Sequence, residues 1–211
     1  MDTFDLIARS RLALADELDR LAPEDWSHPS LCAGWTVHVV AAHLNIPWSV
    51  STPALITAVL RSGGLDRGMH RLSCTLAERL DPGQCVAGLR DHASHRFTPP
   101  GSGPEAPLSD VLVHGNDMLY PLGRMVEPDH EALITALGWL SAGRARGFVP
   151  RGRAEGLTLR ATDLDQTFGS GDRVASGPAL ALCSVLTGRT SMIEELSGPG
   201  VGVLASRLDR R

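Results

Sequence analysis

Apolar residues recur every three or four positions over most of the sequence, which is the spacing of one face of an α-helix. The pattern predicts a series of helices joined by segments rich in proline and glycine. Thr3 and Thr36 are candidate N-caps of the first two helices. Pro23 is expected to end the first of these helices, and Pro47 to kink or end the second. Further helices are predicted over residues 52–62, 65–80, 83–96, 131–147, 178–187 and 190–196, and one more begins within residues 104–109.

The pattern changes after residue 150. Residues 157–163 alternate between apolar and polar side chains, which predicts a β-strand. Two more short strands are predicted over residues 165–169 and 172–176, with a Gly-Ser-Gly turn between them. The last apolar run, residues 201–208, is too short to distinguish a strand from a helix. We therefore expect an α+β protein, with a helical bundle in residues 1–148 and a small α+β domain in residues 149–211.

Composition and charge narrow the classes of function. The chain has 211 residues, of which 43% are apolar and 21% charged, as is usual for a globular protein. The net charge is -4 and no basic stripe is present, so a nucleic-acid partner is not expected. No apolar run approaches the ~20 residues of a membrane span, so no membrane partner is expected. The N-terminus is acidic and lacks the apolar core of a signal peptide, so we expect a cytoplasmic protein.

The four cysteines are scattered along the chain and form no Cys-x-x-Cys pair. In a cytoplasmic protein this pattern predicts four reduced thiols and no disulfide framework. Cys32 lies just before the second predicted helix. A nucleophilic role for Cys32 is disfavoured, because no histidine or acidic residue stands beside it in the sequence to lower the pKa of its thiol.

The stretch over residues 108–123, LSDVLVHGNDMLYPLG, carries the main candidate for chemistry. Asp110 and His114 are four residues apart, so in a helix both side chains leave the same face one turn apart. Such a pair can hold one divalent metal ion, and His43, which lies on the apolar face of its helix, is the best candidate for a third ligand. Asp117 continues the same stripe. The alternative interpretation is that His43 and His114 are hydrogen-bonded histidines packed inside a helical bundle.

Three parts of the sequence together resemble the mycothiol-dependent maleylpyruvate isomerase family, a branch of the DinB-like bundle superfamily. PSLCAGWTVHVVAAHL, residues 29–44, is similar to the Gly-Trp-Thr start and the metal-binding helix of that family. DVLVHGNDMLYPLG, residues 110–123, resembles its acid-x-x-x-His segment. The stretches at residues 159–171, 177–189 and 196–208 resemble its small C-terminal domain. The resemblance covers nearly the whole chain in the same order.

The resemblance implies a DinB-like up-down helical bundle with a divalent metal, zinc, held by His43, Asp110 and His114. It also implies mycothiol, a low-molecular-weight thiol, as cofactor or co-substrate. The family's isomerase has glutamate where this chain has Asp110. Aspartate is one methylene shorter, so the metal must lie closer to this helix or be bound less tightly. The expected function is an isomerase or an S-transferase acting on a small electrophile. Two alternatives stay open: a non-catalytic binding or stress protein that has lost the metal chemistry, and a metal-dependent hydrolase on the same site.

Two further residues complete the expected site. Asp117 is expected to orient His114 by a hydrogen bond rather than to act as a fourth ligand; the alternative is a surface or packing residue. The C-terminal domain is expected to dock near the metal, with Arg189 binding the polar groups of the thiol. The alternative for Arg189 is an interaction with the end of the preceding helix. The expected partners are a small electrophile and the thiol, and the expected state is a monomer or a homodimer.

Overall fold

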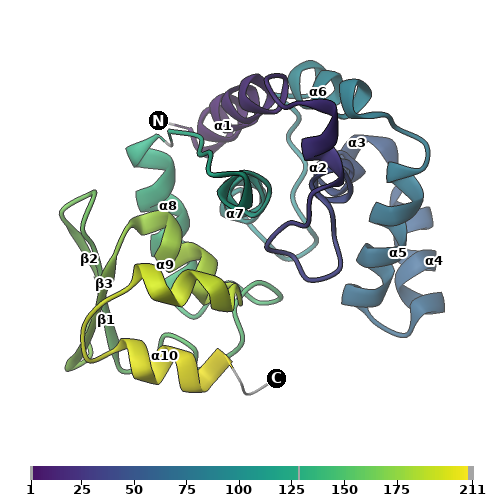
Figure 1. The fold of residues 1–211 in the computed structure, drawn as a ribbon. Helices are drawn as coiled ribbons and strands as arrows, with labels where there is room; N and C mark the ends of the chain where they lie inside the picture. Colours follow the sequence, from purple (N-terminus) through teal and green to yellow (C-terminus); the bar gives the residue numbers. More distant parts are fainter. Residues whose placement is uncertain (1, 128, 209–211) are drawn as a thin grey trace. The chain divides into compact units, whose positions relative to one another are not determined.

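The computed structural model describes residues 2–127 and 129–208 (Figure 1). The fold is mostly helical, with a small three-stranded sheet in the C-terminal region, which confirms the predicted α+β class. The chain divides into two compact units. The helical unit contains residues 7–97 and 114–127, and the sheet unit contains residues 2–6, 98–113 and 129–208. The predicted domain boundary at residue 148 stays a prediction.

Helix α2 (Val37–Leu44) occupies the centre of the helical unit. It begins at the expected N-cap, where the Thr36 hydroxyl accepts a hydrogen bond from the Val39 amide at 3.3 Å. Val40 and Ala41 are fully buried. The helix packs against α5 (Leu65–Ala77) and α6 (Pro82–Asp91), and α5 in turn packs against α4 (Thr52–Ser62), as Figure 1 shows. These contacts fix the side chains that leave α2 toward α5.

Several helices end or begin where the sequence pattern did not place them. In α1 (Thr3–Leu18), Thr3 is already helical, and the Asp2 carboxylate accepts the bond from the Phe4 amide in place of a Thr3 cap. Helix α8 (His130–Ser141) stops six residues before the predicted end, because Gly143 at φ +70° turns the chain away. Helix α6 ends at Asp91 rather than near residue 96.

The early end of α6 has a specific partner. Arg11 is buried, and its Nη1 donates to the backbone carbonyls of His92, Ala93 and His95 at 3.1, 3.0 and 2.9 Å. The Arg11 guanidinium also lies 5.3 Å from the centre of the Trp48 ring. The arginine takes the place of most of the amides that a further helical turn would supply, and of the three carbonyls the one of His92 also accepts from the His95 amide at 2.9 Å. A long-range contact therefore replaces the last turn that the periodicity predicted.

Helix α7 (Glu105–Leu119) carries the acid-x-x-x-His segment. It begins within the predicted range and runs into a short 3₁₀ turn, η2 (Tyr120–Leu122). The division between the two units falls between Val113 and His114, but the helix itself is continuous. A Cβ added to Gly115 would lie 3.4 Å from Cδ1 of Leu14 on α1. Gly115 is therefore explained by close packing between α7 and α1.

The sheet unit contains strands β1 (Leu157–Ala161), β2 (Gln166–Gly169) and β3 (Arg173–Gly177) in the order β2-β1-β3. β1 is antiparallel to β2 and parallel to β3. The three predicted strands are thus present, and the alternate residues of β1 are buried as expected. Helix α9 (Ala179–Leu186) packs against α8 and β1, and residues 201–208 form helix α10 (Val201–Leu208) rather than a strand.

Candidate metal centre

Two imidazoles lie edge to face in the helical unit. His43 comes from the last turn of α2 and His114 from the middle of α7, and both are partly buried. Their ring centroids lie 4.8 Å apart at an interplanar angle of 67°. The apolar face of α2 predicted that His43 points inward, and in the structure it lies beside His114.

Each imidazole is held through its Nδ1 atom. Nδ1 of His114 lies 2.9 Å from Oδ2 of Asp117, and a carboxylate only accepts, so this nitrogen carries the proton. Nδ1 of His43 lies 3.1 Å from the Ser73 hydroxyl, which donates its own proton to the Met69 carbonyl at 2.7 Å and therefore accepts from His43. Both rings are thus in the tautomer in which Nε2 is the unprotonated nitrogen, which is the atom that can ligate a metal.

Asp110 lies one helical turn before His114 on α7, so the spacing of this pair is set by the helix itself. One ligand atom from each of His43, Asp110 and His114 lies within 4.8 Å of the others. The structure therefore groups the three side chains that the sequence analysis named as ligands. A carboxylate oxygen and two imidazole nitrogens form a donor set that suits a divalent metal such as zinc.

Trp35 borders both imidazoles. Its ring centroid lies 5.2 Å from that of His43 and 6.3 Å from that of His114, with the latter pair stacked at 14°. The indole nitrogen of Trp35 donates to Nδ1 of His70 on α5. Trp35 was not among the candidate residues from the sequence, although it lies beside both candidate ligands. The sequence analysis also missed Ser73, for which the sequence carries no local signal.

Cys32 lies in the same cluster. Its Sγ is 3.1 Å from Oδ2 of Asp117 and 3.7 Å from Nδ1 of His114. The side chain of Asp117 is fully buried. Asp117 is therefore a buried hydrogen-bond partner of His114 rather than a surface acid. Cys32, His114 and Asp117 also form a second set whose potential ligand atoms lie within 4.8 Å of one another.

The other cysteines have different surroundings. All four are free thiols, as the sequence predicted. Burial, and to a smaller degree a nearby carboxylate, raises the pKa of Cys85 and of Cys183 to about 12. These two thiols stay protonated and act as small apolar core residues. Cys74 is partly exposed and its Sγ lies 3.8 Å from Nε2 of His70.

Arg189 lies at the end of α9 in the sheet unit. Its Nη1 donates to the carbonyl of Thr187 at 2.9 Å, which is a local contact with the helix C-terminus. This contact is the one that the helix-end interpretation requires. Binding of the thiol by Arg189 stays a prediction.

We expect Arg189→Ala to separate the two roles of this side chain. Loss of the Thr187 contact alone lowers the melting temperature by about 2–4 °C, since one such hydrogen bond contributes about 1 kcal/mol. Thiol affinity, measured by calorimetry, then stays at the wild-type value. A protein of normal stability with weakened thiol binding would instead place Arg189 in the cofactor site.

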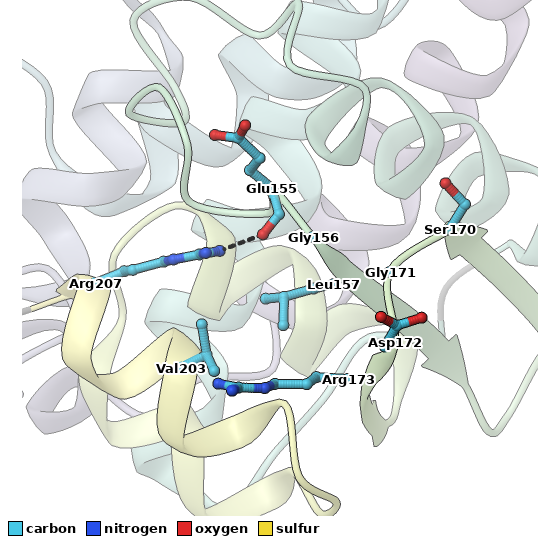
Figure 2. Close-up of a pocket in the computed structure, with 9 residues that line it drawn as sticks. All are labelled: Glu155, Gly156, Leu157, Ser170, Gly171, Asp172, Arg173, Val203 and Arg207. Atoms are coloured by element: carbon cyan, nitrogen blue, oxygen red, sulfur yellow. Dashed lines mark hydrogen bonds between the residues drawn. The ribbon is translucent and has the colours of Figure 1, made fainter.

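A separate depression of about 280 Å³ lies in the sheet unit between the strands and α10 (Figure 2). Arg207 borders it, and its Nη1 donates to the backbone carbonyls of Arg153 and Glu155 at 2.9 and 2.7 Å. Arg207 therefore ties α10 to the segment before β1. The described residues that line the depression are Glu155, Gly156, Leu157, Ser170, Gly171, Asp172, Arg173, Val203 and Arg207. None of these is a histidine or a cysteine.

None of the helices in the described part of the chain has both the length and the apolar content that crossing a membrane requires.

Comparison with known proteins agrees with this architecture. A sequence model of the mycothiol maleylpyruvate isomerase N-terminal domain matches residues 7–165. Two crystal structures of mycothiol-dependent maleylpyruvate isomerase, the second of a histidine-to-alanine mutant, share the fold with TM-scores of 0.57 and 0.55. Each is 16% identical and covers 93% of this chain and 91% of the solved chain. No curated protein matches the sequence significantly.

Proposed function

The chain belongs to the mycothiol maleylpyruvate isomerase N-terminal domain family, and on that premise we propose that it is a divalent-metal enzyme that uses mycothiol to convert a small electrophile. The proposed reaction is either isomerisation of an activated double bond or transfer of the thiol to carbon. The observation that carries the proposal is the grouping of His43, Asp110 and His114 within 4.8 Å, with both Nδ1 atoms already occupied by hydrogen bonds.

The residues present fit a zinc-type site. Three protein ligands leave at least one coordination position open, which is the arrangement of catalytic rather than structural zinc. Ser73 and Asp117 hold the two rings in the tautomer that a metal requires, and the hydrogen bond from Ser73 to the Met69 carbonyl orients its hydroxyl. Asp110 would hold a metal closer to α7 than the longer side chain of a glutamate at this position would.

A bound divalent metal supplies a Lewis acid that lowers the pKa of a coordinated thiol, so that a thiolate nucleophile is present at neutral pH. The protein's own contribution is positional. The indole of Trp35 covers one side of the two imidazoles and limits the access of water there. Asp117 places a buried negative charge behind His114, which strengthens that imidazole as a ligand.

We expect the purified full-length chain to contain about one divalent metal ion per molecule and to require both metal and thiol for turnover. Metal content is measured by elemental analysis, before and after dialysis against a chelator. Turnover is measured with maleylpyruvate and with an alkylating electrophile, each with mycothiol, with another small thiol and with no thiol. Conversion of maleylpyruvate with mycothiol recovered unchanged indicates an isomerase, and consumption of mycothiol indicates a transferase.

Two results would contradict the proposal. A correctly folded chain that binds no divalent metal at micromolar concentration is a binding protein built on the same fold. Metal-dependent turnover that proceeds equally well without any thiol indicates that water is the nucleophile, and the chain is then a hydrolase.

A further inference from the structure

The loop that precedes α2 is fixed by hydrogen bonds at both ends. Pro29 and Thr36 form an isolated antiparallel bridge, and the Ser30 hydroxyl donates to the Trp35 carbonyl at 2.9 Å. The same hydroxyl accepts from the amide of Cys32 at 3.1 Å. The backbone position of Cys32 is therefore set within the loop, independently of its side chain.

The loop is also attached to the end of α7. The amide of Leu31 donates to the backbone carbonyl of Asp117 at 3.0 Å. Next to this contact, Sγ of Cys32 lies 3.1 Å from Oδ2 of Asp117, the same oxygen that accepts from Nδ1 of His114. A fully buried carboxylate is costly unless its oxygens are hydrogen-bonded, and the thiol of Cys32 supplies one of its donors.

The distances favour hydrogen bonding over direct metal ligation by this cluster. Ligands of a tetrahedral zinc ion at about 2.0–2.3 Å are separated from one another by about 3.3–3.8 Å. The separations of Oδ2 of Asp117 from Sγ of Cys32 and from Nδ1 of His114 are shorter, at 3.1 and 2.9 Å. A metal bound at Nδ1 of His114 would also have to displace the proton that Asp117 accepts.

We propose that Cys32 is a positioning residue of the metal centre. Its thiol donates to Asp117 and holds that carboxylate on Nδ1 of His114, so that Nε2 of His114 stays directed at the metal. This inference rests on the proposed function, because it concerns the ligand His114. Cys32, Asp117 and His114 thus form a chain of hydrogen bonds that connects the loop before α2 to the ligand on α7.

The test measures cobalt(II) affinity and the visible spectrum of the metal-free full-length chain on titration with cobalt. Cys32→Ala removes the donor, and we expect about a 10-fold loss of affinity, at the lower end of the 10–100-fold range for outer partners of metal ligands. Cys32→Ser restores a donor and is expected to recover most of the affinity. Cys74→Ala, which alters a partly exposed cysteine on α5, is the matched control and is expected to bind cobalt as the wild type does.

Melting temperatures of the metal-free variants separate positioning from general destabilisation. Reduced affinity in Cys32→Ala that Cys32→Ser recovers, together with any loss of melting temperature, supports the inference. Wild-type affinity in both variants overturns it while leaving the metal site intact. The inference is also overturned if Cys32→Ala loses both affinity and stability and Cys32→Ser recovers neither. An intense thiolate-to-cobalt absorption in the wild type, absent from Cys32→Ser, would make Cys32 a direct ligand. A wild-type chain that binds no cobalt would contradict the proposed function and this inference together.

Discussion

Replacing His114 with alanine is expected to remove stoichiometric metal from the purified protein and to abolish thiol-dependent turnover. His114 offers the ligand atom that lies beside both His43 and Asp110. The loss of metal affinity should exceed about 100-fold, because the loss of an outer partner alone costs 10–100-fold. Metal affinity is measured by competition with a chromophoric chelator, and activity with mycothiol present in excess.

His130→Ala provides the matched control for this experiment. His130 is an exposed histidine at the start of α8 and has no part in the proposed centre. We expect its metal content and turnover to equal those of the wild type. If His114→Ala binds metal as tightly as the wild type does, the ligand set proposed here is wrong. The melting temperature of metal-free His114→Ala should fall by about 3–6 °C, since the buried carboxylate of Asp117 loses a hydrogen bond that contributes about 1.5 kcal/mol.

The largest effect on stability is expected at Arg11, outside the candidate centre. Arg11→Met keeps most of the side-chain length but leaves the carbonyls of His92, Ala93 and His95 without the guanidinium that they accept from. A hydrogen bond to a charged group contributes about 1.5–3 kcal/mol, so we expect a loss of about 3 kcal/mol in the free energy of unfolding. Thermal denaturation followed by circular dichroism should show a melting temperature about 6–12 °C below that of the wild type.

Arg9→Met on the same helix is the natural comparison. Arg9 is exposed, and exposed charged pairs contribute about 0–1 kcal/mol, so its melting temperature should change by a few degrees at most. Arg11→Lys keeps the charge but not the planar group, and an intermediate value is expected. Equal melting temperatures for Arg9→Met and Arg11→Met would show that water satisfies the exposed ends of these carbonyls.

The parts of the site that were predicted from the sequence are those fixed by local geometry. Asp110 and His114 share one turn of α7, so helical spacing alone placed them together. The apolar face of α2 directed His43 inward for the same reason. Ser73 and Cys32 were missed because their partners come from distant segments, 30 residues away for His43 and 85 residues away for Asp117.

The same distinction explains the errors in the helix boundaries. The N-cap at Thr36 is a contact between neighbouring residues and was predicted. The end of α6 is determined by Arg11, which lies 81 to 84 residues from the carbonyls it binds. Periodicity carries no information about such a contact. Residues 201–208 were ambiguous because an eight-residue apolar run fits either a strand or a helix, and only packing within the sheet unit decides.

The placement of two proposed ligands on one helical turn has a consequence for the energetics of folding. Asp110 and His114 can come together in any transient helix, so the denatured ensemble already offers the metal a weak two-point chelate. Metal stabilises the native state only by the ratio of its affinities for the folded and unfolded chains. The native state adds His43, which is brought up by the packing of α2, together with the hydrogen bonds that fix the two rings. The rise in melting temperature with metal concentration would therefore report chiefly the contribution of His43 and its supports, and not the full binding energy of the centre.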